Sequence, residues 1–177
     1  MIFGAIMFAA TGFPVTEGAA AFVNWAGLAA VLLVFGGFRV FAGGHRPFLG
    51  RLGAWGCGLV LAGLAATAVG FIANAAGPLV PKAFEGAVAL AAVPAWTLSH
   101  LIYAGATVVG IACLRARIVP RSTALLLVAS FPLLIAGVSL GLAVGGSAAD
   151  LITWAATEGQ AGLAWALIGA LLCRREY

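Results

Sequence analysis

Long apolar stretches separated by short polar segments constrain the fold of this chain more than any other feature. A helix needs about 20 apolar residues to cross a hydrocarbon core of about 30 Å. Five stretches between the charged residues reach that length, at residues 19–41, 52–76, 94–114, 123–144 and 151–173. Only 8% of the 177 residues are charged and 64% are hydrophobic, whereas soluble domains carry roughly 25% charged residues. The sequence therefore predicts an all-α fold, a polytopic transmembrane helical bundle, with residues 1–177 forming a single transmembrane domain.

A sixth apolar stretch at the N-terminus is shorter than the others. As a helix, residues 2–15 would extend only about 21 Å. The stretch lacks the basic residues that precede the apolar region of a signal peptide, and an incorrectly assigned start would also leave a first span short. We therefore expect six spans, or five if this first stretch does not cross the membrane.

The charged residues are distributed unevenly between the two ends of the predicted helices. Eight of the nine basic residues fall on one side, namely Arg39, Arg46, Arg51, Arg115, Arg117, Arg121, Arg174 and Arg175. Four of the five acidic residues lie toward the other side, namely Glu17, Glu85, Asp150 and Glu158. Basic residues mark the cytoplasmic face of membrane proteins, so the C-terminus is expected in the cytoplasm. The net charge of +4 reflects this asymmetry and not a nucleic-acid-binding patch.

Polar residues cluster on one face of the fourth predicted span and near the start of the sixth. The candidate ligand-binding residues are Trp96, Ser99, His100, Tyr103, Trp154 and Glu158. Those of the fourth span recur at helical spacing and so share a face. A lone carboxylate in hydrocarbon is costly, and His100 is the only ionisable base at the depth of Glu158. We predict a hydrogen-bonded Glu158–His100 pair, which forms either a solute or proton site in an outer-facing pocket or a structural clamp between two helices.

Two connections between the predicted spans carry further expectations. A short helix from about Lys82 to Ala92 fits between prolines and is expected at the outer membrane interface, as a connector or as a lid. His45 is expected in a solvated cytoplasmic loop near the lipid headgroups. Within the fifth span, Pro132 should kink or loosen the helix.

Small residues recur every four positions along several predicted spans. The stripes are Ala62-Ala66-Gly70, Ala106-Gly110, Gly137-Gly141-Gly145 and Gly162-Ala166-Ala170. Small residues let membrane helices approach closely. The stripes predict a tightly packed bundle, or alternatively a surface for a partner subunit or a homo-oligomer. The lipid bilayer is the one partner that the composition requires.

The sequence contains no motif for catalysis, metal binding or a cofactor. The only lysine, Lys82, lies outside the spans, which excludes a Schiff base within the bundle. The two histidines lie at opposite membrane faces and cannot form an axial haem pair. The three cysteines, Cys57, Cys113 and Cys173, lack a CxxC spacing or a histidine partner for a metal. We therefore expect no cofactor and no metal, and an enzyme is disfavoured without being excluded.

Two sequence segments carry a family resemblance. They are His100-x9-Gly110-x4-Arg115-Ala-Arg117-Ile-Val-Pro120-Arg121 and Gly162-Leu-Ala-Trp165-Ala-Leu-Ile-Gly169. This C-terminal part of the chain, from residue 100 onward, resembles a broad class of small multi-pass bacterial inner-membrane proteins of unknown function. The resemblance implies a bacterial inner membrane and a six-helix type of bundle. It implies no activity and no site residues.

Three functions follow from these observations. The first is a non-enzymatic accessory or interaction subunit of a larger membrane complex, favoured by the short cytoplasmic loops, the missing catalytic motifs and the small-residue stripes. The alternative is a small-solute binding or transport protein with an outer-facing polar pocket. A third, an intramembrane lipid-modifying enzyme, would require His100 and Glu158 to open onto the bilayer or the outer surface.

Overall fold

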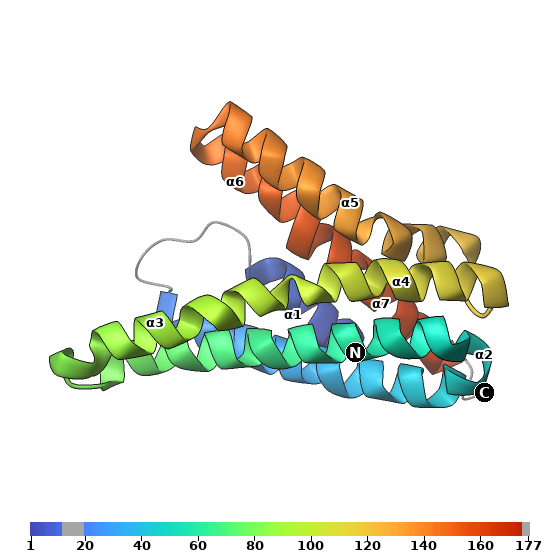
Figure 1. Ribbon diagram of the computed structural model, residues 1–177, viewed down its shortest axis with the longest axis horizontal. Helices are drawn as coiled ribbons and strands as arrows, with labels where there is room; N and C mark the ends of the chain where they lie inside the picture. The colour runs from blue at the N-terminus through green and yellow to red at the C-terminus, as the bar shows by residue number, and fades with distance from the viewer. Residues whose placement is uncertain (12–19, 175–177) are drawn as a thin grey trace.

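Helices account for every regular element in the part of the chain that the structure, a computed structural model, describes, which is residues 1–11 and 20–174 (Figure 1). In chain order they are α1 (Ile2–Thr11), α2 (Ala20–Ala76), the short 3₁₀ turn η2 (Gly77–Leu79), α3 (Lys82–Ser99), α4 (Leu101–Ala116), α5 (Arg121–Val144), α6 (Gly146–Trp154), the π-helical turn η3 (Ala155–Gly159) and α7 (Gln160–Arg174). The all-helical prediction is confirmed for these residues. Three helical stretches are long and apolar enough to cross a membrane: Phe22–Ala76, Lys82–Ala116 and Arg121–Val144. They indicate a membrane protein.

A single glycine turns the long helix α2 back on itself. Gly50 has φ 61° and ψ −168°, a backbone conformation that is open almost only to glycine. The arms before and after it, residues 20–49 and 51–76, lie side by side as a hairpin (Figure 1), with the ring of Phe71 against Gly27. The connection expected between the second and third spans is therefore mostly helix.

The expectation of a solvated loop at His45 is wrong. His45 lies within α2 and is only 7% exposed. Its Nδ1 is 2.8 Å from the carbonyl oxygen of Phe41, and the two rings are 4.6 Å apart. Phe41, His45 and Leu49 recur every four residues and are all buried, so they form one inward face of the helix. Ile118, which follows α4, and Leu172 of α7 lie around the imidazole.

Helix α3 is longer than the connector or lid helix that the sequence predicts. It begins at Lys82, as the sequence indicated, but continues through Pro94 to Ser99 instead of ending at the interface. Near its end, the Trp96 ring packs against Gly70 and lies edge-on to Phe71, with ring centroids 5.2 Å apart. This end of α3 therefore packs against α2, whereas Phe84, Leu90 and Val93 earlier in the helix are 60%, 73% and 59% exposed.

Close contacts at glycines hold the helices together. A Cβ atom at Gly105 of α4 would lie 2.6 Å from the backbone nitrogen of Val60 in α2. Gly110, Gly137 and Gly162, each from one of the predicted small-residue stripes, meet α5, η3 and α1 at similarly short range. Such distances mean that the helices approach one another closely at these glycines. These three glycines are therefore packed inside the bundle and are not free to form a surface for a partner.

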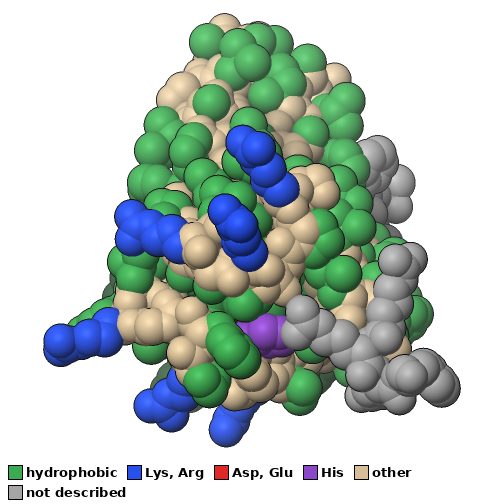
Figure 2. Space-filling view, turned by 90° about the vertical axis from the view of Figure 1, so that its right-hand side faces the viewer, with side chains coloured by type: hydrophobic (Ala, Val, Ile, Leu, Met, Phe, Trp, Pro, Cys, Tyr) green, Lys and Arg blue, Asp and Glu red, His purple; other side chains and the backbone are tan. Residues whose placement is uncertain are grey.

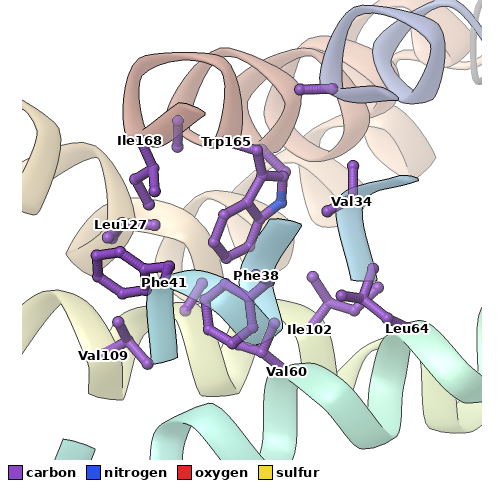
Figure 3. Close-up of a cluster of buried hydrophobic side chains, with 14 of the residues drawn as sticks. Val34, Phe38, Phe41, Val60, Leu64, Ile102, Val109, Leu127, Trp165 and Ile168 are labelled. Carbon is purple, nitrogen blue, oxygen red and sulfur yellow. The ribbon is translucent and has the colours of Figure 1, made fainter. Parts of the chain in front are cut away.

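An aromatic cluster fills the centre of the bundle (Figure 3). The ring of Phe38 lies 5.2 Å from that of Trp165, edge to face, and 5.8 Å from that of Phe41. All three side chains are at most 1% exposed. Edge-to-face packing of this kind adds to the contact energy of the rings. The cluster joins the first arm of α2 to α7.

The short helix α1 packs between α2 and α7. Gly4 lies against Leu33, and Gly162 receives Ala5 and Ala9. The first predicted span is therefore helical and part of the bundle as far as residue 11. Its remainder, residues 12–15, lies outside the described residues, as do the charged residues Glu17, Arg175 and Glu176.

Arginine side chains gather at one end of the bundle (Figure 2). Arg46 and Arg51 flank the Gly50 turn, Arg115 lies in the last turn of α4, and Arg121 begins α5. No acidic side chain is visible on this face in Figure 2. The two arms of α2 and the pair α4–α5 therefore present their basic residues at the same end, as the sequence predicts.

Thr107 of α4 provides hydrogen-bond partners for backbone groups of α5 near Pro132. Proline has no N–H, so the carbonyl of Val128 lacks its helical donor. The hydroxyl of Thr107 in α4 donates to that carbonyl oxygen at 3.0 Å and accepts the N–H of Phe131 at 3.1 Å. The helix continues through the proline to Val144 because its freed backbone groups are satisfied from α4.

We expect Thr107→Val to destabilise the protein by about 1–2 kcal/mol, because it removes both hydrogen bonds and keeps the shape of the side chain. Unfolding in detergent, followed by tryptophan fluorescence, measures the loss. Thr97→Val is the matched control, since the partner of the Thr97 hydroxyl within the described residues is the Val93 carbonyl of its own helix. Equal effects of the two substitutions would contradict the bridging role of Thr107.

Candidate functional site

A cavity of about 310 Å³ lies where helices α1 to α6 and the turn η3 meet. It is placed along α4 well away from the arginine end, because His100 precedes Arg115 by 15 residues, or about 22 Å of helix. In Figure 1, α5 and α6 diverge from α2 and α3 beyond this region. The cavity thus lies where α5 and α6 begin to separate from α2 and α3.

Five of the six candidate residues line this cavity: Trp96, Ser99, His100, Tyr103 and Glu158. The sixth, Trp154, lines an adjoining open groove of about 620 Å³. Cavity and groove share Val138, Thr153 and Glu158, so the groove leads directly to the cavity. The structure therefore brings residues from two distant parts of the sequence to one place.

The expected hydrogen bond between Glu158 and His100 is not formed. Among the described residues, the carboxylate of Glu158 accepts a hydrogen bond from the Thr157 hydroxyl, while His100 Nδ1 lies 3.0 Å from the carbonyl oxygen of Thr97. His100 is exposed and Glu158 half-buried. Because each finds a partner on its own helix, the two side chains lie at the cavity without clamping the helices together.

His100 is positioned by a break between two helices. It ends α3 and begins α4, and its backbone N–H points to the carbonyl groups of Thr97 and Leu98. The Ser99 hydroxyl donates to the Trp96 carbonyl at 2.6 Å. Side chains that bond to nearby backbone carbonyls compete with the regular helical pattern. The break places Ser99, the last residue of α3, and His100 at the lining of the cavity.

Glu158 is carried by the π-helical turn η3. A π turn inserts one extra residue into a helix and is frequent at functional sites. Within it, the Thr157 hydroxyl lies 2.6 Å from the Thr153 carbonyl oxygen and also within reach of Glu158. One hydroxyl proton cannot serve both acceptors at once. The carboxylate therefore has only a shared donor in the described part of the chain.

Trp154 ties α6 to α1. Its Nε1 donates to the carbonyl oxygen of Ala9 at 2.6 Å, near the end of α1 where helical carbonyls lack donors. The indole nitrogen is therefore engaged by the protein, and the ring presents only its apolar surface to the groove. The ligand contact that the sequence predicts for Trp154 stays a prediction.

The sequence analysis missed several residues of the cavity. Thr67 and Phe71 of α2 face it four residues apart, and Thr153 and Thr157 lie beside Glu158. The second pair could have been found, because Asp150, Thr153, Trp154, Thr157 and Glu158 follow a spacing of 0, 3, 4, 7 and 8, which is one helical face. Phe8 of α1 also lines the cavity, and no pattern in its segment points to it.

Similarity to other proteins does not assign this cavity a role. No protein-family model, no curated protein and no solved structure matches this chain. The resemblance to small bacterial membrane proteins stays a prediction. The function must therefore be inferred from the side chains that line the cavity and the groove.

Proposed function

We propose that this protein binds a small polar solute in the cavity, as a membrane-embedded binding or transport protein. One observation carries the proposal: polar side chains from α2, the α3–α4 break and the π turn η3 all face the same cavity. Its volume of about 310 Å³ lies at the lower end of the range of about 300–1,000 Å³ that is usual for small-molecule sites. The expected ligand is accordingly of small-metabolite size.

The hydrogen bonds at the cavity favour binding over catalysis. A serine nucleophile requires a base within hydrogen-bonding distance. Ser99 instead donates to the Trp96 carbonyl, and His100 is engaged by Thr97. An intramembrane lipid-modifying enzyme therefore has less support than a binding protein.

The membrane arrangement forms part of the proposal. We infer that the two arms of α2, the α3–α4 helix, α5 and the α6–α7 helix provide five crossings and that α1 belongs to a sixth. The arginine end then faces the cytoplasm of a bacterial inner membrane. In that orientation the cavity and groove open toward the outer side, from which the solute enters past Asp150 at the groove.

Mass spectrometry of the natively extracted protein tests the proposal. Wild type is expected to retain a small molecule that Ser99→Phe loses, since a phenyl group at Ser99 would occupy part of the cavity. Leu90→Phe is the matched control, because Leu90 lies on α3 and is 73% exposed. Retention of the same molecule by Ser99→Phe, in a protein that elutes like wild type, would contradict the proposal.

An accessory subunit of a membrane complex is the second candidate. Its support is the exposure of α5. In an apolar segment of 18 residues within α5, 28% is buried, against 44% in the corresponding segments of the other two long helical stretches. A partner helix packed on α5 would cover that surface. Extraction in mild detergent tests this candidate, and a monomer without any associated protein would count against it.

A further inference from the structure

We propose that the solute is a small organic ammonium ion, bound with its charged nitrogen beside Glu158 and the rings of Phe71, Trp96 and Tyr103. This inference rests on the proposed function, because it assigns a chemical class to the ligand of the same cavity. It is carried by three independent properties of the lining: its charge, its aromatic rings and the direction of its hydroxyl groups.

The charge of the site favours a cation. Glu158 is the one carboxylate among the described residues that line the cavity, and Asp150 is a second on the adjoining groove. No lysine or arginine lines either space within the described chain. Apart from the imidazole of His100, an anion would meet this carboxylate without a basic side chain in the described lining, and a half-buried site does not screen that repulsion well. A cation would instead supply the counter-charge that Glu158 lacks.

Aromatic rings surround the cavity from four helices. Phe8, Phe71, Trp96 and Tyr103 belong to α1, α2, α3 and α4 respectively. Phe71 and Trp96 lie edge-on at 5.2 Å with an interplanar angle of 83°, so their faces point in different directions. The faces of aromatic rings attract cations, and several rings around one site bind ammonium groups. Tyr103 is 5% exposed, so only a small part of its surface faces the cavity.

Two hydroxyl groups of the lining, those of Thr67 and Ser99, offer a ligand only their acceptor lone pairs. Thr67 and Ser99 direct their protons to the backbone carbonyls of Gly63 and Trp96, at 2.8 and 2.6 Å. A hydroxyl that donates its proton to a backbone carbonyl can still accept a hydrogen bond through its oxygen lone pairs. Together with the Glu158 carboxylate, these two hydroxyl groups present acceptors to a ligand. The complementary ligand is one that carries N–H donors and a positive charge.

Three probes of nearly the same shape test the inference: 2-phenylethylammonium, 2-phenylethanol and 3-phenylpropionate. Binding is measured by calorimetry with the full chain in nanodiscs, with empty nanodiscs to subtract partition into lipid. The ammonium is expected to bind roughly tenfold or more tightly than the alcohol, and the carboxylate more weakly than both. Preference of wild type for the alcohol or the carboxylate would overturn the cationic class and leave the solute site standing.

Two substitutions locate the preference. Glu158→Gln is expected to remove most of the advantage of the ammonium over the alcohol, whereas Glu85→Gln, an acid in the first turn of α3 outside the cavity, should leave it unchanged. If Glu158→Gln does not fold, Phe71→Leu should weaken the ammonium several-fold and the alcohol little. A preference that survives these substitutions overturns the inference. Equal binding of all three probes to wild type and to Ser99→Phe would contradict the proposed function itself.

Discussion

Replacing Gly105 with valine is expected to destabilise the protein by about 3 kcal/mol or more, the largest effect of any single substitution considered for this fold. A Cβ atom at this position would lie 2.6 Å from the Val60 nitrogen and 2.8 Å from the Gly56 carbonyl oxygen. Both neighbours are backbone atoms of α2, so no side chain can rotate away. The helices α2 and α4 would have to separate, and α4 carries His100 and Tyr103 to the cavity.

Gly58→Val is the matched control for Gly105→Val. Gly58 lies in the same arm of α2 as Val60, and a Cβ atom there meets nothing within 4 Å. Valine is also the better helix former of the two residues, so this control should be neutral or slightly stabilising. Thermal unfolding in detergent, followed by size-exclusion chromatography, compares the two variants. A Gly105→Val protein as stable as Gly58→Val would show that α2 and α4 are not in backbone contact.

Close packing of this kind could be anticipated from the sequence only in outline. The small-residue stripes indicated which helices would approach closely, and Gly110 and Gly162 do pack against neighbours. Spacing alone does not say which neighbour a stripe meets. Gly105, the glycine of α4 that meets the α2 backbone at 2.6 Å, precedes the predicted stripe on the fourth span by one residue. One helical position turns a side chain by about 100°, so the partner helix decides which small residue is critical.

The candidate site was predicted in composition but not in its bonding. Helical spacing placed Trp96, Ser99, His100 and Tyr103 on one face, and all four line the cavity. A direct Glu158–His100 bond was expected from depth alone. It fails because a side chain can satisfy itself on its own helix: Thr157 serves Glu158, and a backbone carbonyl lies beside the imidazole. Local partners of this type are visible only when the helix ends and the π turn are known.

The turn between the first two long arms was misjudged for a related reason. Glycines, Pro47 and arginines between residues 42 and 51 resemble a loop by composition. The helix nevertheless continues to Leu49, because Phe41, His45 and Leu49 are buried on one face. Burial of that face outweighs the helix-breaking tendency of the intervening residues. All of the chain reversal is left to one residue, Gly50.

Gly50→Ala is therefore expected to cost about 1–3 kcal/mol, although alanine adds only one methyl group. The added Cβ meets no atom within 4 Å, so steric contact with neighbours does not contribute. The cost is the backbone strain of holding an L-residue at φ 61° and ψ −168°. If the backbone at residue 50 instead changes conformation to relieve this strain, the two arms of α2 pack differently and Phe71 no longer contacts Gly27.

Gly43→Ala separates this strain from the ordinary effect of adding a methyl group. Gly43 lies in the same helix, has open space around its Cβ position and has no positive φ. Alanine should stabilise the helix there by up to about 1 kcal/mol, so the two substitutions should shift the unfolding temperature in opposite directions. Shifts of the same sign would mean that Gly50 does not adopt the reversed conformation in the membrane. Since the hairpin positions Thr67 and Phe71 at the cavity, Gly50→Ala should also weaken retention of the small molecule expected in the wild-type protein, whereas Gly43→Ala should not.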